Sequence, residues 1–152
     1  LSGFDVQVLA FDKYVHGFGN GQVKETTVQE IFEKADVLSL HLPLTEETKY
    51  MIDYRFFSSF KKPIWFINIS RGKVLRTADL LRCLNEGKIY GAALDVFENE
   101  KLKTFTEDEK KIFDALIADK RVLLSPHIAG WTHESKRKIA EVLLQKIRAI
   151  QK

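Results

Sequence analysis

The chain has 152 residues, of which 45% are hydrophobic and 30% charged, and its formal net charge is +3. That length allows one globular domain with a core rather than two, and because the charges are mixed, we expect no nucleic-acid partner. No apolar run approaches the roughly 20 residues of a membrane span, and the N-terminal residues do not read as a signal peptide. With a single cysteine, Cys83, we expect a cytoplasmic protein without a membrane partner.

Short apolar runs alternate with amphipathic segments along the chain. The expected strands are residues 6–11, 37–42, 64–69, 91–96 and 122–124, and the expected helices are residues 27–34, a piece within 50–60, 78–86, 107–117 and 133–150. Nearly continuous apolar runs are typical of strands buried on both faces. Five repeats of strand and helix predict an α/β fold, a Rossmann-like doubly wound parallel sheet with helices on both faces.

The expected helices begin and end at residues that suit those positions. Thr27 precedes the first helix, with Glu30 three residues later, as in a capping box. Thr77 and Thr106 precede the third and fourth helices and can cap them in the same way. Gly87 follows the third helix, where a glycine tolerates a positive φ.

In a doubly wound sheet, ligands collect beyond the carboxyl ends of the strands. The residues found there are Asp12 and the sequences HLP, SRG, DVFENE and SPHIAG. A carboxylate such as Asp12 at the end of a Rossmann strand accepts hydrogen bonds from the adenosine ribose. The alternative for Asp12 is the start of a surface turn.

Three charged or titratable side chains follow successive strands. Arg71, beside a glycine, suits a bidentate grip on a carboxylate or phosphate, although it also suits a surface position. His127 follows a buried strand and a proline, and a nearby carboxylate such as Glu100 would hold its tautomer. A lone histidine is more often structural, but the three residues together favour acid–base chemistry.

Other chemistries have less support in the sequence. Neither Ser70 nor Ser125 lies in a G-x-S-x-G elbow, and no Walker loop is present. The four histidines lack the spacing of zinc ligands, so we expect no metal site. After the first strand, the sequence has neither a cluster of acidic residues, as in a response regulator, nor a phosphate-binding loop for a flavin.

Three long stretches carry a family resemblance. DVLSLHLPLTEETKYMI, INISRGKVLRTADLLRCLNEGKIYGAALDVFENE and VLLSPHIAGWTHES closely resemble the NAD-binding domain of the D-isomer-specific 2-hydroxyacid dehydrogenases, a family that includes phosphoglycerate, glycerate and D-lactate dehydrogenases. The likeness runs from residue 1 to about residue 144. It implies an NAD-dependent oxidoreductase that interconverts a D-2-hydroxy acid and its 2-keto acid, and a homodimer. The choice of acid stays open.

The resemblance also implies residue roles. Arg71 matches the arginine that holds the substrate carboxylate and carbonyl, His127 the acid–base histidine, and Glu100 its carboxylate partner. The implied cofactor contacts are Asp12 on the ribose, Leu42, Pro43 and Thr48 on the adenine and phosphate side, Ile69 and Ser70 on the nicotinamide half and Asp95 near the carboxamide, with Arg71, His127 and Gly130 also near NAD. His41 stands at a family position, and we interpret it as structural.

The sequence departs from the family pattern at three points. Lys101 follows Glu100 where proline is usual, and Trp131 stands where smaller residues are common. The glycine-rich loop, the strand before it and the substrate domain have no counterpart in residues 1–152, which we therefore interpret as a partial NAD-binding domain.

The absence of the glycine-rich loop and of the strand before it leads to expectations about strand pairing and activity. By the strand order 3-2-1-4-5-6, residues 6–11 and 64–69 should each expose an unpaired edge. We expect closure of these two edges, disorder of the first βα unit or strand exchange between copies, and we expect the isolated chain to bind NAD poorly and to be inactive. The alternative function is a non-catalytic, corepressor-like relative, although such a protein would not need Arg71, Glu100 and His127 together.

Overall fold

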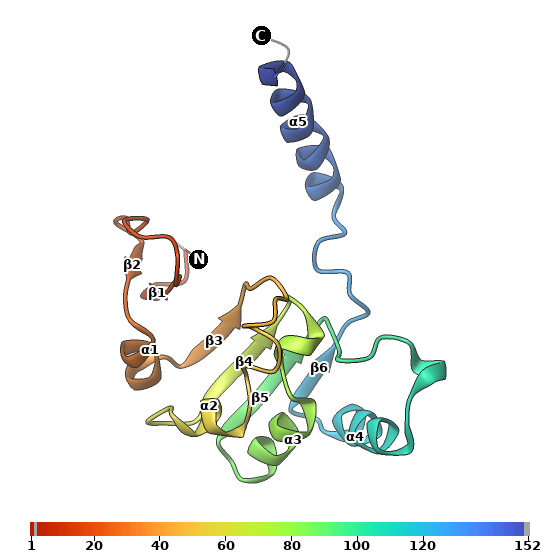
Figure 1. Ribbon diagram of the computed structural model, residues 1–152. Helices are drawn as coiled ribbons and strands as arrows, with labels where there is room; N and C mark the ends of the chain where they lie inside the picture. Colours follow the sequence, from red (N-terminus) through yellow and green to blue (C-terminus); the bar gives the residue numbers. More distant parts are fainter. Residues whose placement is uncertain (2, 151–152) are drawn as a thin grey trace.

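The structure, a computed structural model, describes Leu1 and residues 3–150. Its strands form two parallel sheets (Figure 1), one ordered β1-β2 and one ordered β3-β4-β5-β6. The strands are β1 (Val8–Ala10), β2 (Val23–Glu25), β3 (Val37–Leu40), β4 (Ile64–Asn68), β5 (Ile89–Leu94) and β6 (Val122–Leu124). Every strand pair is parallel, so the predicted Rossmann-like α/β class is confirmed.

In the described part of the chain, five α-helices and two short 3₁₀ turns connect and follow the strands. The helices are α1 (Val28–Lys34), α2 (Tyr54–Ser58), α3 (Thr77–Asn85), α4 (Glu107–Ala118) and α5 (His133–Ile150), and the 3₁₀ turns are η1 (Gly72–Val74) and η2 (Leu102–Thr104). Each α-helix lies within two residues of its expected position or inside the expected segment. Among the described residues, no helix combines the length and apolar character that crossing a membrane requires.

Strand β2 was not predicted, and it changes the strand count. Its three residues, VKE, contain no apolar run, yet they pair in register with β1, Val8 opposite Val23. The expectation of an open edge at residues 64–69 is therefore wrong, because β4 pairs with β3 on one side and β5 on the other. Within the described sheets, the edges left open toward the gap belong to β1 and β3, and they do not close onto each other.

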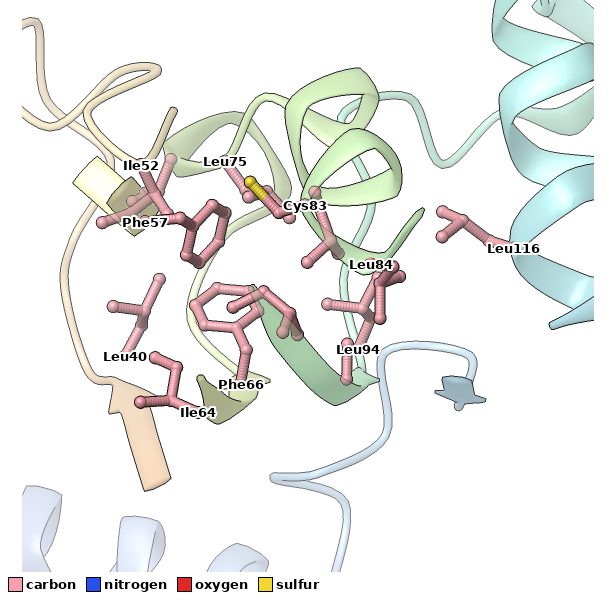
Figure 2. Close-up of a cluster of buried hydrophobic side chains, with 14 residues drawn as sticks. Leu40, Ile52, Phe57, Ile64, Phe66, Leu75, Cys83, Leu84, Leu94 and Leu116 are labelled. Carbon is pink, nitrogen blue, oxygen red and sulfur yellow. The ribbon is translucent and has the colours of Figure 1, made fainter. Parts of the chain in front are cut away.

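The hydrophobic core lies between the four-stranded sheet and helices α2, α3 and α4 (Figure 2). Phe57 of α2 packs edge-on against Phe66 of β4, with ring centroids 5.1 Å apart. Leu84 of α3 and Leu116 of α4 are fully buried in the same cluster. Burial of this apolar surface is what holds the helices against the sheet.

The opposite face of the four-stranded sheet is exposed. Burial alternates along β4, where Ile64 and Phe66 are buried but Trp65 is 52% exposed. Tyr90 and Leu123 on the neighbouring strands are also exposed. The expectation of helices on both faces is thus wrong for the described residues, because α5 extends away from the sheet and buries no side chain (Figure 1).

The three threonine caps have different outcomes. The Thr27 hydroxyl accepts from the Glu30 N–H at 3.2 Å, and Thr106 forms a complete capping box with Glu109. The Thr77 cap is wrong, because α3 begins at Thr77 itself and its N-cap, Arg76, makes no side-chain bond to the helix. The N–H of the buried first residue, Thr77, instead finds its acceptor elsewhere in the chain.

A conservative pair of substitutions tests where the core lies. Ile64→Val removes one methyl from a fully buried side chain and is expected to lower the free energy of unfolding by about 1 kcal/mol. The same change in α5, Ile139→Val, affects a side chain that is 65% exposed and should alter stability by less than about 0.5 kcal/mol. Urea denaturation followed by circular dichroism measures both. Equal effects would contradict this placement of the core.

Candidate active site

The carboxyl ends of three adjacent strands bring the predicted site residues to one edge of the sheet. Strands β4, β5 and β6 pair in parallel in that order. Arg71 follows β4, Glu100 follows β5 and His127 follows β6. Since parallel strands end at the same edge, the three loops share one side of the domain.

A buried asparagine shapes the turn that carries Arg71. The Asn68 Oδ1 accepts from the backbone N–H and the hydroxyl of Ser70 at 3.1 and 2.9 Å, and its Nδ2 donates to the Arg71 carbonyl at 3.2 Å. The exposed Arg71 guanidinium donates one hydrogen bond, from Nη1 to the Ser70 carbonyl at 2.7 Å. Within residues 1 and 3–150, its other N–H groups have no acceptor, so they remain for a planar anion such as a carboxylate.

Glycine at position 72 lets two of these loops touch. A Cβ on Gly72 would lie 1.7 Å from the Phe97 carbonyl oxygen and 2.6 Å from the Glu98 nitrogen. These are backbone atoms that cannot move aside as a flexible side chain can. The Arg71 turn therefore packs directly on the loop that leads to Glu100.

Glu100 and His127 form a pair. The His127 Nδ1 lies 3.0 Å from the Glu100 Oε2, and the two side chains are 47% and 46% exposed. A carboxylate on Nδ1 fixes the ring orientation and leaves Nε2 to exchange a proton. The pair forms although Lys101 replaces the usual proline, because the Asn99 Oδ1 accepts from the Lys101 N–H at 3.0 Å and closes the turn.

Asp95 is a buried carboxylate whose two oxygens both accept hydrogen bonds from the His127 loop. Its Oδ1 accepts from the Ser125 hydroxyl at 2.5 Å and the Ile128 N–H at 2.9 Å, and its Oδ2 accepts from the Ala129 N–H at 2.9 Å. Burial raises the pKa of Asp95, but these hydrogen bonds outweigh burial and hold the pKa below its usual value. The contact with the nicotinamide carboxamide stays a prediction, and the structure adds the loop contacts.

The backbone of His127 shows why the loop needs such support. His127 has φ 55°, which lies in the left-handed region that L-residues rarely adopt. The two amides that follow it, of Ile128 and Ala129, both donate to Asp95. Asp95 thus holds His127 in a strained conformation, a role that the sequence alone did not reveal.

The adenosine side of the expected cofactor site is built by the loops after β1 and β3. The Asp12 Oδ1 accepts from the N–H groups of Tyr14 and Val15 at 2.8 and 2.9 Å, and these bonds lower the pKa of Asp12. The Tyr14 hydroxyl donates to the Glu47 Oε2 at 2.5 Å, and Lys13 pairs with Glu47. Glu47 therefore ties the Asp12 loop to the segment that contains Leu42, Pro43 and Thr48.

The other expected cofactor residues differ in what they expose. Ile69 is 41% exposed at the end of β4, whereas Ser70 is buried and its hydroxyl bonds to Asn68. The Thr48 hydroxyl donates to the Pro43 carbonyl at 2.7 Å, so it stabilises its own loop. Gly130 is exposed, with open space where a Cβ would lie. Their contacts with a cofactor stay predictions.

Comparison with known proteins decides the family. The model of the NAD-binding domain of the D-isomer specific 2-hydroxyacid dehydrogenases matches residues 1–129. The chain belongs to this family. Among the described residues, no three His, Cys, Asp or Glu side chains converge as a metal site.

Curated relatives have related activities and are longer. A glyoxylate reductase from Thermofilum pendens is 37% identical over 155 residues, covering 100% of this chain and 43% of its own length. A D-lactate dehydrogenase from Staphylococcus aureus is 33% identical over 146 residues, covering 92% of this chain and 44% of its own. The chain thus spans less than half the length of these relatives.

Solved structures of longer dehydrogenases also match nearly the whole of this chain with about half of their own length. The NAD complex of a D-isomer specific 2-hydroxyacid dehydrogenase from Lactobacillus delbrueckii ssp. bulgaricus superposes with a TM-score of 0.82 at 28% identity, covering 99% of this chain and 47% of that one. The D-lactate dehydrogenase of Aquifex aeolicus with NAD and lactic acid gives 0.78 at 30% identity, covering 98% and 47%.

NAD is the cofactor of this family domain, and the described residues fit it. The lowered pKa of Asp12 keeps the carboxylate ionised, and only its Oδ1 is used by the backbone. The other oxygen suits a ribose hydroxyl donor. At the opposite end of the site, exposed Ile69 offers an apolar surface for a nicotinamide ring.

Asp95 gives a stability prediction with a defined pH dependence. In Asp95→Asn, an amide NH₂ faces N–H groups from which the carboxylate accepted hydrogen bonds. The free energy of unfolding at pH 7 should therefore fall by about 2–4 kcal/mol. The pKa of Asp95 in the folded protein lies below its value in the unfolded chain, which is about 3.9. The ionised carboxylate therefore stabilises the fold above about pH 3.9, and this stabilisation is lost as the pH falls through the folded-state pKa. The difference in unfolding free energy between the unsubstituted chain and Asp95→Asn should therefore shrink below about pH 4.

Urea titrations at a series of pH values measure the effect of Asp95→Asn. Asp114→Asn, on the exposed surface of α4, is the matched control and should change stability by less than about 0.5 kcal/mol. A deficit that stays constant from pH 7 to pH 3 would mean that the charge of Asp95 does not stabilise the loop.

Proposed function

We propose that this chain supplies the substrate-binding arginine and the acid–base pair of an NAD-dependent oxidoreductase acting on a D-2-hydroxy acid. The observation that carries the proposal is the 3.0 Å contact between His127 and Glu100 at the sheet edge that also presents Arg71. A non-catalytic, corepressor-like protein would not require an imidazole paired with a carboxylate and an exposed guanidinium at the same sheet edge. The retained pair therefore favours an enzyme.

The residues have separate roles in the proposed reaction. Arg71 binds the substrate carboxylate and polarises the 2-keto oxygen. His127 gives a proton from Nε2 to that oxygen during reduction and removes it from the hydroxyl in the reverse direction. Glu100 stabilises the imidazolium form before the proton leaves. NAD, when bound, accepts or supplies the hydride.

In this proposal, Asp12 makes the site select NAD rather than NADP. Its ionised carboxylate accepts from ribose hydroxyls, and it repels the extra phosphate of NADP. The arrangement favours NAD over NADP.

The proposal also concerns how much of the enzyme these 152 residues provide. Relatives are more than twice as long as the matched region, and residues 1–152 contain no G-x-G-x-x-G sequence to bind a pyrophosphate. We infer that the isolated chain binds NAD weakly and does not turn over a 2-keto acid. We also infer a homodimer, and the exposed apolar sheet face around Trp65 and Leu123 supports a surface that another chain covers.

A fusion protein tests this function. The region of the Staphylococcus aureus D-lactate dehydrogenase that precedes the match is joined to residue 1 of this chain, and NADH oxidation is followed with pyruvate and with glyoxylate. The fusion should turn over one or both acids, whereas the 152-residue chain alone should not, because it lacks a pyrophosphate-binding loop. Light scattering should give twice the mass of the fusion chain. A folded fusion without activity, or rapid turnover by the chain alone, would count against the proposal.

Substitutions in the same fusion separate the two roles. Arg71→Lys loses the planar fork, so the KM for the keto acid should rise about 10-fold or more. Glu100→Gln removes the charge that supports the imidazolium, so kcat should fall about 100-fold. Steady-state kinetics with each substrate varied in turn measure both.

An exposed ion pair on α3 provides matched controls. Arg82 and Glu86 are 2.7 Å apart at the surface, so Arg82→Lys and Glu86→Gln repeat the two chemical changes away from the site. Both should leave kcat and both KM values within about twofold. If Arg71→Lys and Glu100→Gln behave like these controls, the assigned roles are wrong.

A further inference from the structure

The N-terminus of helix α3 is capped by a side chain from the next strand's loop. Its N-cap residue, Arg76, makes no side-chain bond to the helix. Instead, the Thr77 N–H donates to the Glu98 Oε1 at 2.5 Å, across 21 residues of sequence. A carboxylate at this position also interacts favourably with the helix dipole.

The same loop is held at a second point. Gly72 lies against the backbone of Phe97 and Glu98, with no room for a Cβ between them. The segment from Arg71 to Thr77 is therefore held to the loop of residues 97–98 at both of its ends. Arg71 precedes the first contact by one residue, and Glu100 follows Glu98 by two.

These contacts connect the two halves of the reaction site. Arg71 binds the substrate in the proposed function, and Glu100 orients His127, which moves the proton. No hydrogen bond between Arg71 and either partner of that pair is present among the described contacts. Residues 50–52 also form backbone hydrogen bonds with the Arg71–Thr77 segment, and the packing of this segment on the loop of residues 97–98 relates it to the Glu100–His127 pair.

We propose that Glu98 is a positioning residue, which sets the distance between Arg71 and the Glu100–His127 pair by holding the Arg71–Thr77 segment against the Glu100 loop. This inference rests on the proposed function. Glu98 does not touch the substrate, and its carboxylate acts through the Thr77 amide. This role requires an acceptor oxygen within hydrogen-bond distance of the Thr77 N–H, and it does not require a negative charge.

A neighbouring cavity makes loss of this side chain tolerable for folding. A cavity of about 260 Å³ lies beside Glu98 and Thr77, with Asp79 and Glu109 in its polar wall. Water that enters this space can accept the Thr77 N–H when the carboxylate is removed. Glu98→Ala should therefore fold, while the loop and the helix lose their fixed spacing.

Three substitutions in the active fusion distinguish position from charge. Glu98→Gln keeps the length and an acceptor oxygen, so it should retain kcat within about twofold. Glu98→Asp keeps the charge but is one methylene shorter, and Glu98→Ala has no acceptor, so both should lower kcat about 10- to 100-fold and raise the KM for the keto acid. The KM for NADH should stay unchanged in all three.

Asp53→Ala is the matched control. The Asp53 Oδ1 accepts from the Phe56 N–H at 2.8 Å and caps α2, a helix that carries none of the site residues. This variant loses a helix-capping carboxylate and destabilises the fold, but it should leave kcat and both KM values unchanged. A purely structural role for Glu98 predicts that Glu98→Ala behaves like Asp53→Ala.

A second measurement does not depend on activity. Amide hydrogen exchange on the 152-residue chain should increase about fivefold in Glu98→Ala, both at Thr77 and within the η1 turn, where the Leu75 N–H donates to the Gly72 carbonyl. In Asp53→Ala the increase should be confined to α2. Faster exchange at Thr77 alone would mean that Glu98 caps α3 without holding the turn, which overturns the proposal.

The two measurements separate the possible failures. If the unsubstituted fusion has no activity, the proposed function fails, and the exchange data still decide whether Glu98 joins the two loops. If the fusion is active and Glu98→Asp retains kcat while Glu98→Gln loses it, the charge acts and the positioning role is wrong. Unchanged kinetics in all three variants overturn it as well.

Discussion

The buried carboxylate of Asp95 is the interaction on which the candidate site depends. It stands directly after β5 and accepts three hydrogen bonds from the segment that follows β6. Without them, the chain around His127 would have to satisfy two backbone amides in water and give up its left-handed turn. Because β5 is paired on both sides and contributes buried side chains to the core, a central strand of the sheet supports the left-handed backbone of His127.

The sequence predicts the strand ends well and the contacts between loops poorly. Arg71, Glu100 and His127 emerge as candidates from the sequence because each follows a short, nearly continuous apolar run, and such runs mark buried parallel strands. Strand β2 escapes detection because three residues with a central lysine carry no periodic signal. The Glu98 cap escapes because its partner lies 21 residues away, whereas capping rules concern neighbours in sequence.

In the proposed function, the cofactor site draws on both sheets. The β1-β2 pair carries Asp12 and the four-stranded sheet carries the loop after β3 for the adenosine end, while the loops after β4, β5 and β6 serve the nicotinamide end. Glu47 joins the two parts through Lys13 and Tyr14, a surface contact that contributes little to stability on its own. A dinucleotide bound across both parts would therefore stabilise their arrangement as well as take part in the reaction.

The left-handed backbone at His127 also limits which residues evolution or a protein engineer can place there. Glycine and asparagine adopt φ near 55° at little cost, whereas β-branched residues do not. Replacement of the histidine by valine would therefore remove the imidazole and disturb the loop at once. Asparagine is the substitution that deletes the imidazole of the proposed proton carrier while leaving the main chain in place, and inactive relatives that keep this loop should favour asparagine or glycine at the position.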